Sequence, residues 1–180
     1  TFNITQTSAL YPLSDQLAND PRMIRGRELM IVGASTTAYE AAEAEFDALR
    51  ADYKTDPLST YQLAIFFRDG GLYKLSITAA ADLITAAGID TTQAPSFIAR
   101  LRYPVYYKDL VLPAAQQYNL DPLLVFSLIR QESLFEGFAT SYAAAQGLMQ
   151  IIPDTGQWIA MQLGWPDYQN SDVYRPYINV

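Results

Sequence analysis

Apolar residues recur at helical spacing along most of the chain, and no segment of any length alternates with a period of two. The clearest helix in the front half covers residues 36–50. Its apolar stripe consists of Tyr39, Ala42, Phe46 and Leu49. A later stripe, ended by Gly88, consists of Leu72, Leu75, Ala79, Leu83 and Ala86. This pattern predicts an all-α fold.

Asp-Pro pairs at 20–21, 56–57 and 121–122 mark the starts of three further helices. The Asp side chain can accept hydrogen bonds from the first free amides, and Pro suits the first helical position. Gly33 and the pair 70–71 are expected to end the first two helices. The first two starts lie 36 positions apart (56 − 20), which hints at a tetratricopeptide-like helical solenoid. An irregular helical array is an equal alternative.

The segment 89–96 (IDTTQAPS) is the best candidate for a linker. We therefore expect a solenoid-like helical and linker region over residues 1–98 and a second helical domain over residues 99–180. In the second domain, helices are predicted from 104 to 118, with a kink at Pro113, then from 122 to 132, and from 153 to 163.

The composition of the chain excludes several kinds of partner and catalytic mechanism. Half of the 180 residues are apolar and 17% are charged, as in a globular protein, and the net charge of −7 argues against nucleic acid as a partner. The chain has no cysteine and no histidine, which excludes thiolate zinc sites and the Ser-His-Asp and Cys-His mechanisms. Carboxylates, Lys, Tyr or hydroxyls must do any chemistry, and no metal or other cofactor is implied.

The sequence shows no transmembrane segment, because no apolar run reaches the length a helix needs to span a bilayer. It begins at Thr1 without Met or a signal peptide. We therefore expect it to be a piece of a longer protein.

Glu132 is the candidate acid. It lies near the carboxyl end of a helix that is apolar on nearly every face, so we expect that helix to be buried. Burial and the negative end of the helix dipole would both raise the pKa of the carboxyl group, as a general acid requires. The alternative is an ordinary solvated glutamate. Glu136, one turn further on, is interpreted as solvated.

Small and aromatic residues near Glu132 have two interpretations. The run 143–147 would let a ligand approach the backbone closely, or it reflects tight packing. Aromatic side chains could stack on sugar faces, although at helical spacing they more often belong to a core; they are Phe135, Tyr142, Trp158 and Trp165.

Four short motifs carry a resemblance to a known family. They are ESLF at 132–135, ATS at 139–141, GLMQ at 147–150 and P-x-T at 153–155. Together they resemble the soluble lytic transglycosylases of bacterial cell-wall turnover. Ser141 follows Glu132 by nine positions (141 − 132) and Gln150 by eighteen (150 − 132), as in that family. The resemblance is strong over 103–156 and looser over 20–90, where these enzymes often carry an α-superhelical region.

The resemblance implies a lysozyme-like, mostly α catalytic domain, similar to goose-type lysozyme. It implies a peptidoglycan lytic transglycosylase, a carbon–oxygen lyase that cleaves the β-1,4 bond between N-acetylmuramic acid and N-acetylglucosamine. Glu132 would act alone as general acid and then general base and leave a 1,6-anhydro end. Phe135 would help to wall off the acid. The other implied substrate-binding residues are Ser133, Ser141, Gly147, Leu148, Met149 and Gln150.

The same resemblance implies a peptidoglycan glycan strand as the partner and a periplasmic or secreted location in the bacterial cell envelope. The helical N-terminal region is a candidate surface for a protein partner.

The sequence departs from the family in two places. Ala144 stands where the family usually has glycine, so the loop must accept a methyl group there. Residues 176–180 resemble a segment of the family that precedes its third motif. That motif contains a tyrosine that hydrogen-bonds the acid. We therefore expect a catalytic domain truncated at its carboxyl end, inactive or weak, with apolar surface left uncovered.

Two alternative functions remain. A lysozyme-type hydrolase of the same fold would normally use a second carboxylate, and none stands near Glu132 in an obvious partner role. A non-catalytic helical module that binds glycan or protein would not need the intact motifs around Glu132.

Overall fold

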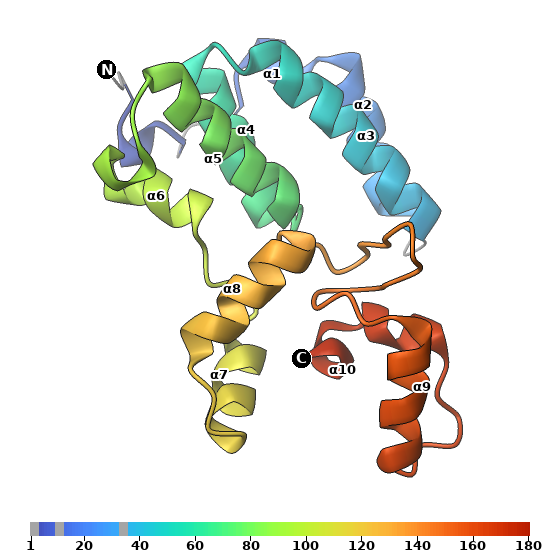
Figure 1. Ribbon diagram of the computed structural model, residues 1–180. Coiled ribbons are helices and arrows are strands. Elements are labelled where there is room, and N and C mark those ends of the chain that lie inside the picture. Colours follow the sequence, from blue (N-terminus) through green and yellow to red (C-terminus); the bar gives the residue numbers. More distant parts are fainter. Residues whose placement is uncertain (1–3, 10–12, 33–35) are drawn as a thin grey trace. The chain divides into compact units, whose positions relative to one another are not determined.

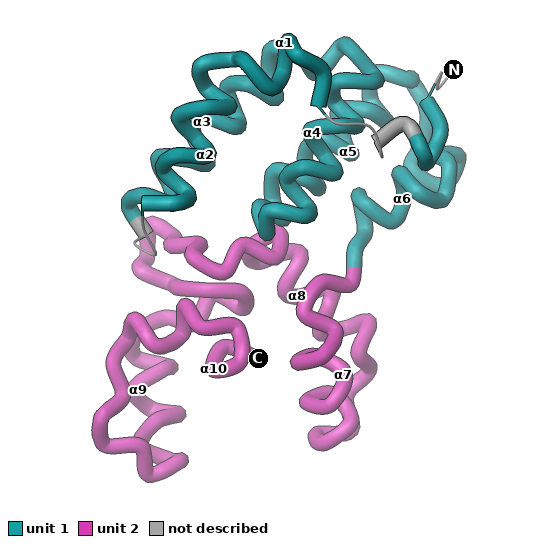
Figure 2. The backbone as a smooth tube through the Cα atoms, turned by 180° about the vertical axis from the view of Figure 1, so that it is seen from behind, with its two compact units in different colours: residues 1–104 teal, residues 105–180 magenta. Residues whose placement is uncertain are grey.

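The computed structural model describes residues 4–9, 13–32 and 36–180. The chain divides into two compact units, residues 1–104 and 105–180 (Figure 2). Within the described ranges the secondary structure is helical, apart from isolated β-bridges in one loop. The predicted all-α fold is confirmed.

The helices follow the chain in the order drawn in Figure 1. Unit 1 contains η1 (Gln6–Ala9), α1 (Asp15–Ala18), α2 (Pro21–Val32), α3 (Thr36–Tyr53), α4 (Pro57–Asp69), α5 (Tyr73–Ala87), η2 (Thr91–Gln93) and α6 (Ser96–Arg102). Unit 2 contains α7 (Lys108–Gln117), α8 (Pro122–Ser133), α9 (Pro153–Gln162), η3 (Asn170–Tyr174) and α10 (Pro176–Asn179).

Local end signals set most helix boundaries. The side chain of Asp56 accepts the Leu58 amide of α4 at 3.2 Å, as an N-cap should. Gly88 ends α5 in the left-handed region at φ 65°. The predicted stop at Gly33 lies outside the described residues.

Helix pairs build unit 1. Helix α2 packs along α3, and α4 packs along α5 (Figure 1). The predicted stripe of α3 is confirmed, because Ala42, Phe46 and Leu49 are buried and Tyr39 packs against their cluster. The stripe of α5 is buried as well, except at its last member, Ala86, which is exposed.

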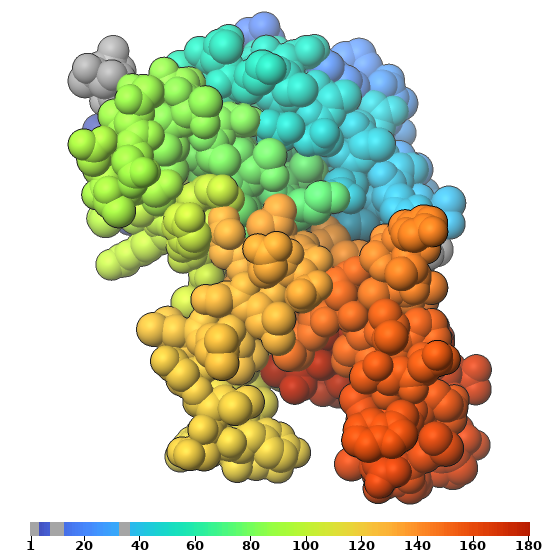
Figure 3. Space-filling view, viewed as in Figure 1, coloured from blue at the N-terminus to red at the C-terminus, as the bar shows by residue number. Residues whose placement is uncertain are grey.

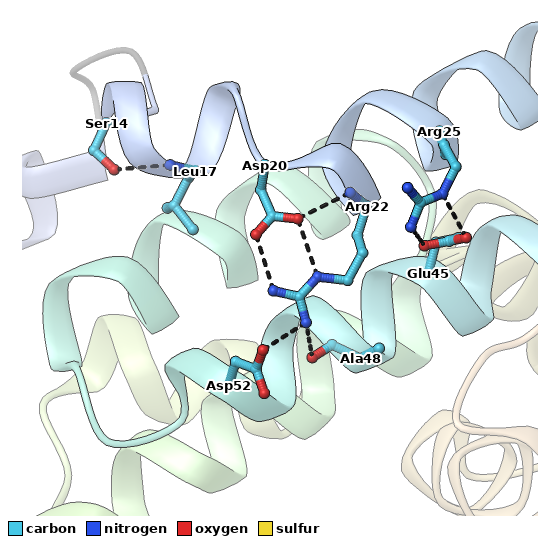
Figure 4. A network of polar contacts seen from close by, with 8 residues as sticks. All are labelled: Ser14, Leu17, Asp20, Arg22, Arg25, Glu45, Ala48 and Asp52. Atoms are coloured by element: carbon cyan, nitrogen blue, oxygen red, sulfur yellow. Dashed lines mark hydrogen bonds and ion pairs between the residues drawn. The ribbon is translucent and has the colours of Figure 1, made fainter.

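A polar network fastens the start of α2 to α3 (Figure 4). The Arg22 guanidinium donates to both oxygens of Asp20 and, at 2.6 Å, to Asp52. Arg25 makes a two-bond ion pair with Glu45 at 2.7 and 2.8 Å. The bonds from Arg22 lower the pKa of Asp20, and the bond from Arg25 lowers the pKa of Glu45. Both carboxylates therefore favour the folded state near neutral pH.

The segment that reads as a linker lies within unit 1. It contains η2, which the Asp90 side chain caps through the Thr92 amide at 2.9 Å. The following helix, α6, buries Ile98 and Leu101 in the core shared by α4 and α5. Unit 1 ends at Pro104.

Unit 2 begins with a shorter helix than the sequence predicts. Tyr107 precedes α7 in the left-handed region at φ 57°, so the helix starts at Lys108 rather than near 104. Asn119, at φ 52°, forms the turn to α8, and the Asp121 side chain accepts the Leu123 amide at 2.8 Å. Gly164, at φ 65°, follows α9, next to the predicted helix end at 163.

The expectation that α8 is buried on nearly all sides is wrong. The helix buries Val125, Phe126, Ile129 and Ser133, one stripe of its surface. Leu123, Leu124 and Leu128 are 67%, 63% and 41% exposed. Helix α9, deep orange in the space-filling view, is also exposed, with Trp158 at 58% and Met161 at 61% (Figure 3). No helix in the described part of the chain is long and apolar enough to cross a membrane.

Candidate active site

Glu132 lies on the last turn of α8 and is exposed to solvent. The expected burial of this carboxyl group is therefore not observed. It shares the solvent-facing side of α8 with Leu128, one turn earlier, while Ile129 and Ser133 face inward.

The chain reverses direction directly after Glu132 through two left-handed residues. Leu134 has φ 51° and Phe135 has φ 65°, although neither is glycine. Such residues cost roughly 1–2 kcal/mol each, and they persist where the surrounding structure holds them. Phe135 is fully buried and packs edge-on against Tyr106, with ring centroids 5.5 Å apart. Its packing therefore fixes the turn that ends the helix of the candidate acid.

Glu136 is buried, so its interpretation as a solvated residue is wrong. Its Oε1 accepts the amide of Phe138 at 3.2 Å, and its own amide donates to the Ser133 carbonyl at 3.0 Å. The helical spacing that placed it one turn beyond Glu132 ends at Ser133. The reversed chain turns this side chain inward instead.

Residues 139–151, here called the 139–151 loop, fold on themselves without forming a helix or a strand. The Ser141 hydroxyl accepts the amides of Ala143 at 3.2 Å and Ala145 at 3.0 Å, which leaves its hydrogen available to a ligand. Between them, Ala144 occupies the left-handed region at φ 58°. The loop thus accepts the methyl group at 144, at the cost of a strained backbone.

The second half of the loop is a small hairpin. Gln146 exchanges backbone hydrogen bonds with Ile151 at 3.0 and 3.1 Å. The Gln150 side chain donates to the carbonyls of Ala139 at 3.2 Å and Gly147 at 2.9 Å. Gln150 therefore closes the loop from inside. The Met149 side chain is partly exposed, whereas Leu148 is buried.

Ser133 connects this hairpin to the helix of the candidate acid. Its Oγ lies 2.8 Å from the Leu148 carbonyl and 3.1 Å from the Ile129 carbonyl, and the residue is buried. The hydroxyl of Ser133 thus holds the 139–151 loop against the end of α8, next to Glu132.

The sequence interpretation missed Asn179, which is buried in α10 and hydrogen-bonded to the same loop. Its signal in the sequence is weak, a single amide in a strip that otherwise reads as a loop. Of the aromatic residues considered for sugar stacking, Tyr142 is fully exposed on the loop. Trp165 packs against Tyr168, with ring centroids 5.4 Å apart.

Fold and site together define an all-α protein with a lysozyme-like domain whose candidate acid ends a helix beside a tight loop. The fold matches that of the 70-kDa soluble lytic transglycosylase of Escherichia coli, with a TM-score of 0.71 and 23% identity over 93% of this chain. It also matches the lytic transglycosylase Slt of Pseudomonas aeruginosa, solved as an inactive mutant, with a TM-score of 0.72 and 21% identity over 99% of this chain.

Residues 109–180 match the family model of the transglycosylase SLT domain. Curated relatives include the membrane-bound lytic murein transglycosylase C of Haemophilus influenzae, 45% identical over 49 residues and 27% of this chain. The protein of the same name from Glaesserella parasuis is 37% identical over 76 residues and 41% of this chain. The match of residues 109–180 to this domain confirms the resemblance seen in the sequence.

The chain is much shorter than these relatives. It spans 14% and 21% of the two curated proteins and 25% and 26% of the two solved chains.

Proposed function

We propose that this chain carries the acid-bearing part of a peptidoglycan lytic transglycosylase. The observation that supports this most is the link between Glu132 and the 139–151 loop. The residue next to the acid, Ser133, holds the carbonyl of Leu148 at 2.8 Å, within the GLMQ motif. A general acid and a ligand-facing loop on one rigid support can hold a polymer bond in a fixed place beside a proton donor.

In the proposed reaction, the Glu132 carboxyl group gives its proton to the glycosidic oxygen while the bond from that oxygen to C1 of N-acetylmuramic acid breaks. The 2-acetamido group of the substrate stabilises the cation. The Glu132 carboxylate then takes the proton of the muramyl O6 hydroxyl as O6 attacks C1. The 1,6-anhydro ring forms, Glu132 is protonated again, and no water is consumed.

The loop would meet the glycan. The hydroxyl hydrogen of Ser141 is available for a sugar oxygen, and the partly exposed Met149 and the backbone around Gly147 would line the groove. Ser133 and Gln150 already bond to backbone carbonyls. We therefore assign these two to shaping the groove more than to contacting the sugar.

Glu136 is the carboxylate closest in sequence to the acid, and its surroundings favour transglycosylation. A hydrolase would use a second carboxylate to activate water or to attack C1. Glu136 is buried and accepts the amide of Phe138. The names of the relatives, lytic murein transglycosylases, point the same way. They also support a place in the bacterial envelope and peptidoglycan as the partner.

The test incubates the purified chain with peptidoglycan sacculi and analyses the released material by mass spectrometry. We expect slow release of 1,6-anhydromuropeptides, abolished in Glu132→Gln, with glycan binding retained. Glu28→Gln, which changes an exposed glutamate of α2, is the matched control and should release as much as the unchanged chain.

Three results would contradict the proposal. Full release by the Glu132→Gln variant would remove the assigned acid. Products with reducing ends and added water would point to a lysozyme-type hydrolase. A chain that neither binds glycan nor releases product would point to a non-catalytic helical module.

A further inference from the structure

Asn179 is a buried amide with every hydrogen-bonding group in use. Its Nδ2 donates to the carbonyl of Val173 at 2.7 Å and to that of Gln146 at 3.1 Å. Its Oδ1 accepts the amide of Met149 at 2.7 Å. The residue is 4% exposed. The amide therefore joins η3 and the 139–151 loop through one side chain.

Two of these bonds reach residues on either side of Gly147, namely Gln146 before it and Met149 after it. Gly147 itself has φ 74°. A Cβ on Gly147 would lie 2.3 Å from Nδ2 of Asn179 and 2.2 Å from the Val173 carbonyl. The glycine thus lets the backbone of the loop approach the amide closely, and the amide replaces backbone partners that a strand or a helix would supply.

The loop fixed in this way also contacts the end of α8. Leu148 lies between the two loop residues that Asn179 holds, and its carbonyl accepts the Ser133 hydroxyl at 2.8 Å. A shift of the backbone at 146–149 would move the partner of Ser133 next to Glu132. A continuous chain of hydrogen bonds therefore runs from Asn179 through the loop to the turn of the candidate acid.

We infer that Asn179 is a positioning residue that sets the shape of the 139–151 loop and, through it, the affinity for the glycan. This inference rests on the proposed function. It adds a residue 47 positions after the acid (179 − 132) that acts without touching the substrate.

The test compares Asn179→Leu, which keeps the size but removes all three hydrogen bonds, with the unchanged chain. Hydrogen exchange of the Met149 amide should become at least tenfold faster, while amides in the middle of α8 keep their rates. The dissociation constant for a chitotetraose probe, measured on folded protein, should rise about tenfold, which corresponds to ~1.4 kcal/mol. Asn170→Leu is the matched control. Among the described residues, the Asn170 side chain makes one hydrogen bond, in which its Oδ1 accepts the Tyr168 hydroxyl at 3.3 Å.

A second variant, Asn179→Asp, covers the case in which the leucine variant fails to fold. It retains an acceptor for Met149 but cannot donate while it is ionised. When protonated, it regains one donor, so its glycan affinity relative to the unchanged chain should improve from pH 7 to pH 4. No such improvement would contradict the inference.

The outcomes separate the inference from the function on which it rests. Faster exchange at Met149 with unchanged glycan affinity would overturn the positioning role and leave the proposed function intact. An unchanged exchange rate of the Met149 amide in Asn179→Leu would overturn the positioning role as well. An unchanged chain that does not bind chitotetraose would count against the proposed function, and the exchange rates would then decide whether Asn179 orders the loop.

Discussion

Replacing Gly147 with alanine should strongly destabilise unit 2. The residue lies in the left-handed region at φ 74°, where a side chain costs roughly 1–2 kcal/mol. The new Cβ would also lie 2.2 Å from the Val173 carbonyl and 2.3 Å from Nδ2 of Asn179. Overpacking of this kind costs about 1–3 kcal/mol. We therefore expect Gly147→Ala to lower the free energy of unfolding by roughly 2–5 kcal/mol.

The matched control is Gly164→Ala. Gly164 has φ 65°, and a Cβ there would meet nothing within 4 Å. This variant should show the backbone cost alone, roughly 1–2 kcal/mol. The difference between the two variants then measures the crowding at Gly147.

Tryptophan fluorescence during urea unfolding is the appropriate assay. The chain has two tryptophans, Trp158 and Trp165, and both lie in unit 2. The signal therefore follows this unit, and linear extrapolation gives its free energy of unfolding. If Gly147→Ala costs no more than Gly164→Ala, the close packing of the loop against Asn179 is not present in solution.

Three further predictions concern single contacts. Ala144→Gly should stabilise unit 2 by about 0.5 kcal/mol in the same urea assay, because relief of the left-handed strain exceeds the added entropy of glycine; a loss of stability would contradict this. Ser133→Ala should cost about 1–3 kcal/mol, because the buried Leu148 carbonyl loses its donor, and an unchanged urea midpoint would contradict it. In unit 1, Arg22 holds the pKa of Asp20 below its ordinary value, so this carboxylate stabilises the fold above about pH 4 and ceases to do so as the pH falls through its lower folded value. Circular dichroism melts should therefore show Asp20→Asn less stable than the unchanged chain at pH 6, with a smaller difference at pH 3; an equal difference at both would contradict the assignment.

The helices could be predicted because their ends are local. Asp56 and Asp121 cap the helices that follow them, and Gly88 and Gly164 adopt the left-handed geometry expected beyond a helix. Each signal acts within a few residues, so it depends little on distant parts of the chain. The start of α7 shows the limit, since Tyr107 interrupts the helix with a left-handed backbone that its residue type does not favour.

Burial could not be predicted in the same way. Helix α8 is apolar on several sides, yet which side is covered depends on segments far away in the sequence. Glu132 is exposed, and Glu136, four residues later, is buried. Helical spacing treats this pair as neighbours on one face. The left-handed turn at Leu134 and Phe135 separates them, and aromatic packing around Phe135 holds that turn.

The motifs found in the sequence name the residues of the site but not the way they are held. The spacing from Glu132 to Gln150 fits a family pattern, yet Gln150 and Ser133 point their polar groups at backbone carbonyls of the loop and the helix. A residue can thus belong to a motif near the acid because it fixes the backbone there, without binding the sugar. Asn179 acts by the same physical rule, since a loop without a helix or strand needs side chains to satisfy its amides and carbonyls. The positions that determine where Glu132 lies are therefore those whose side chains bond to backbone, and a search limited to groups able to transfer protons would overlook them.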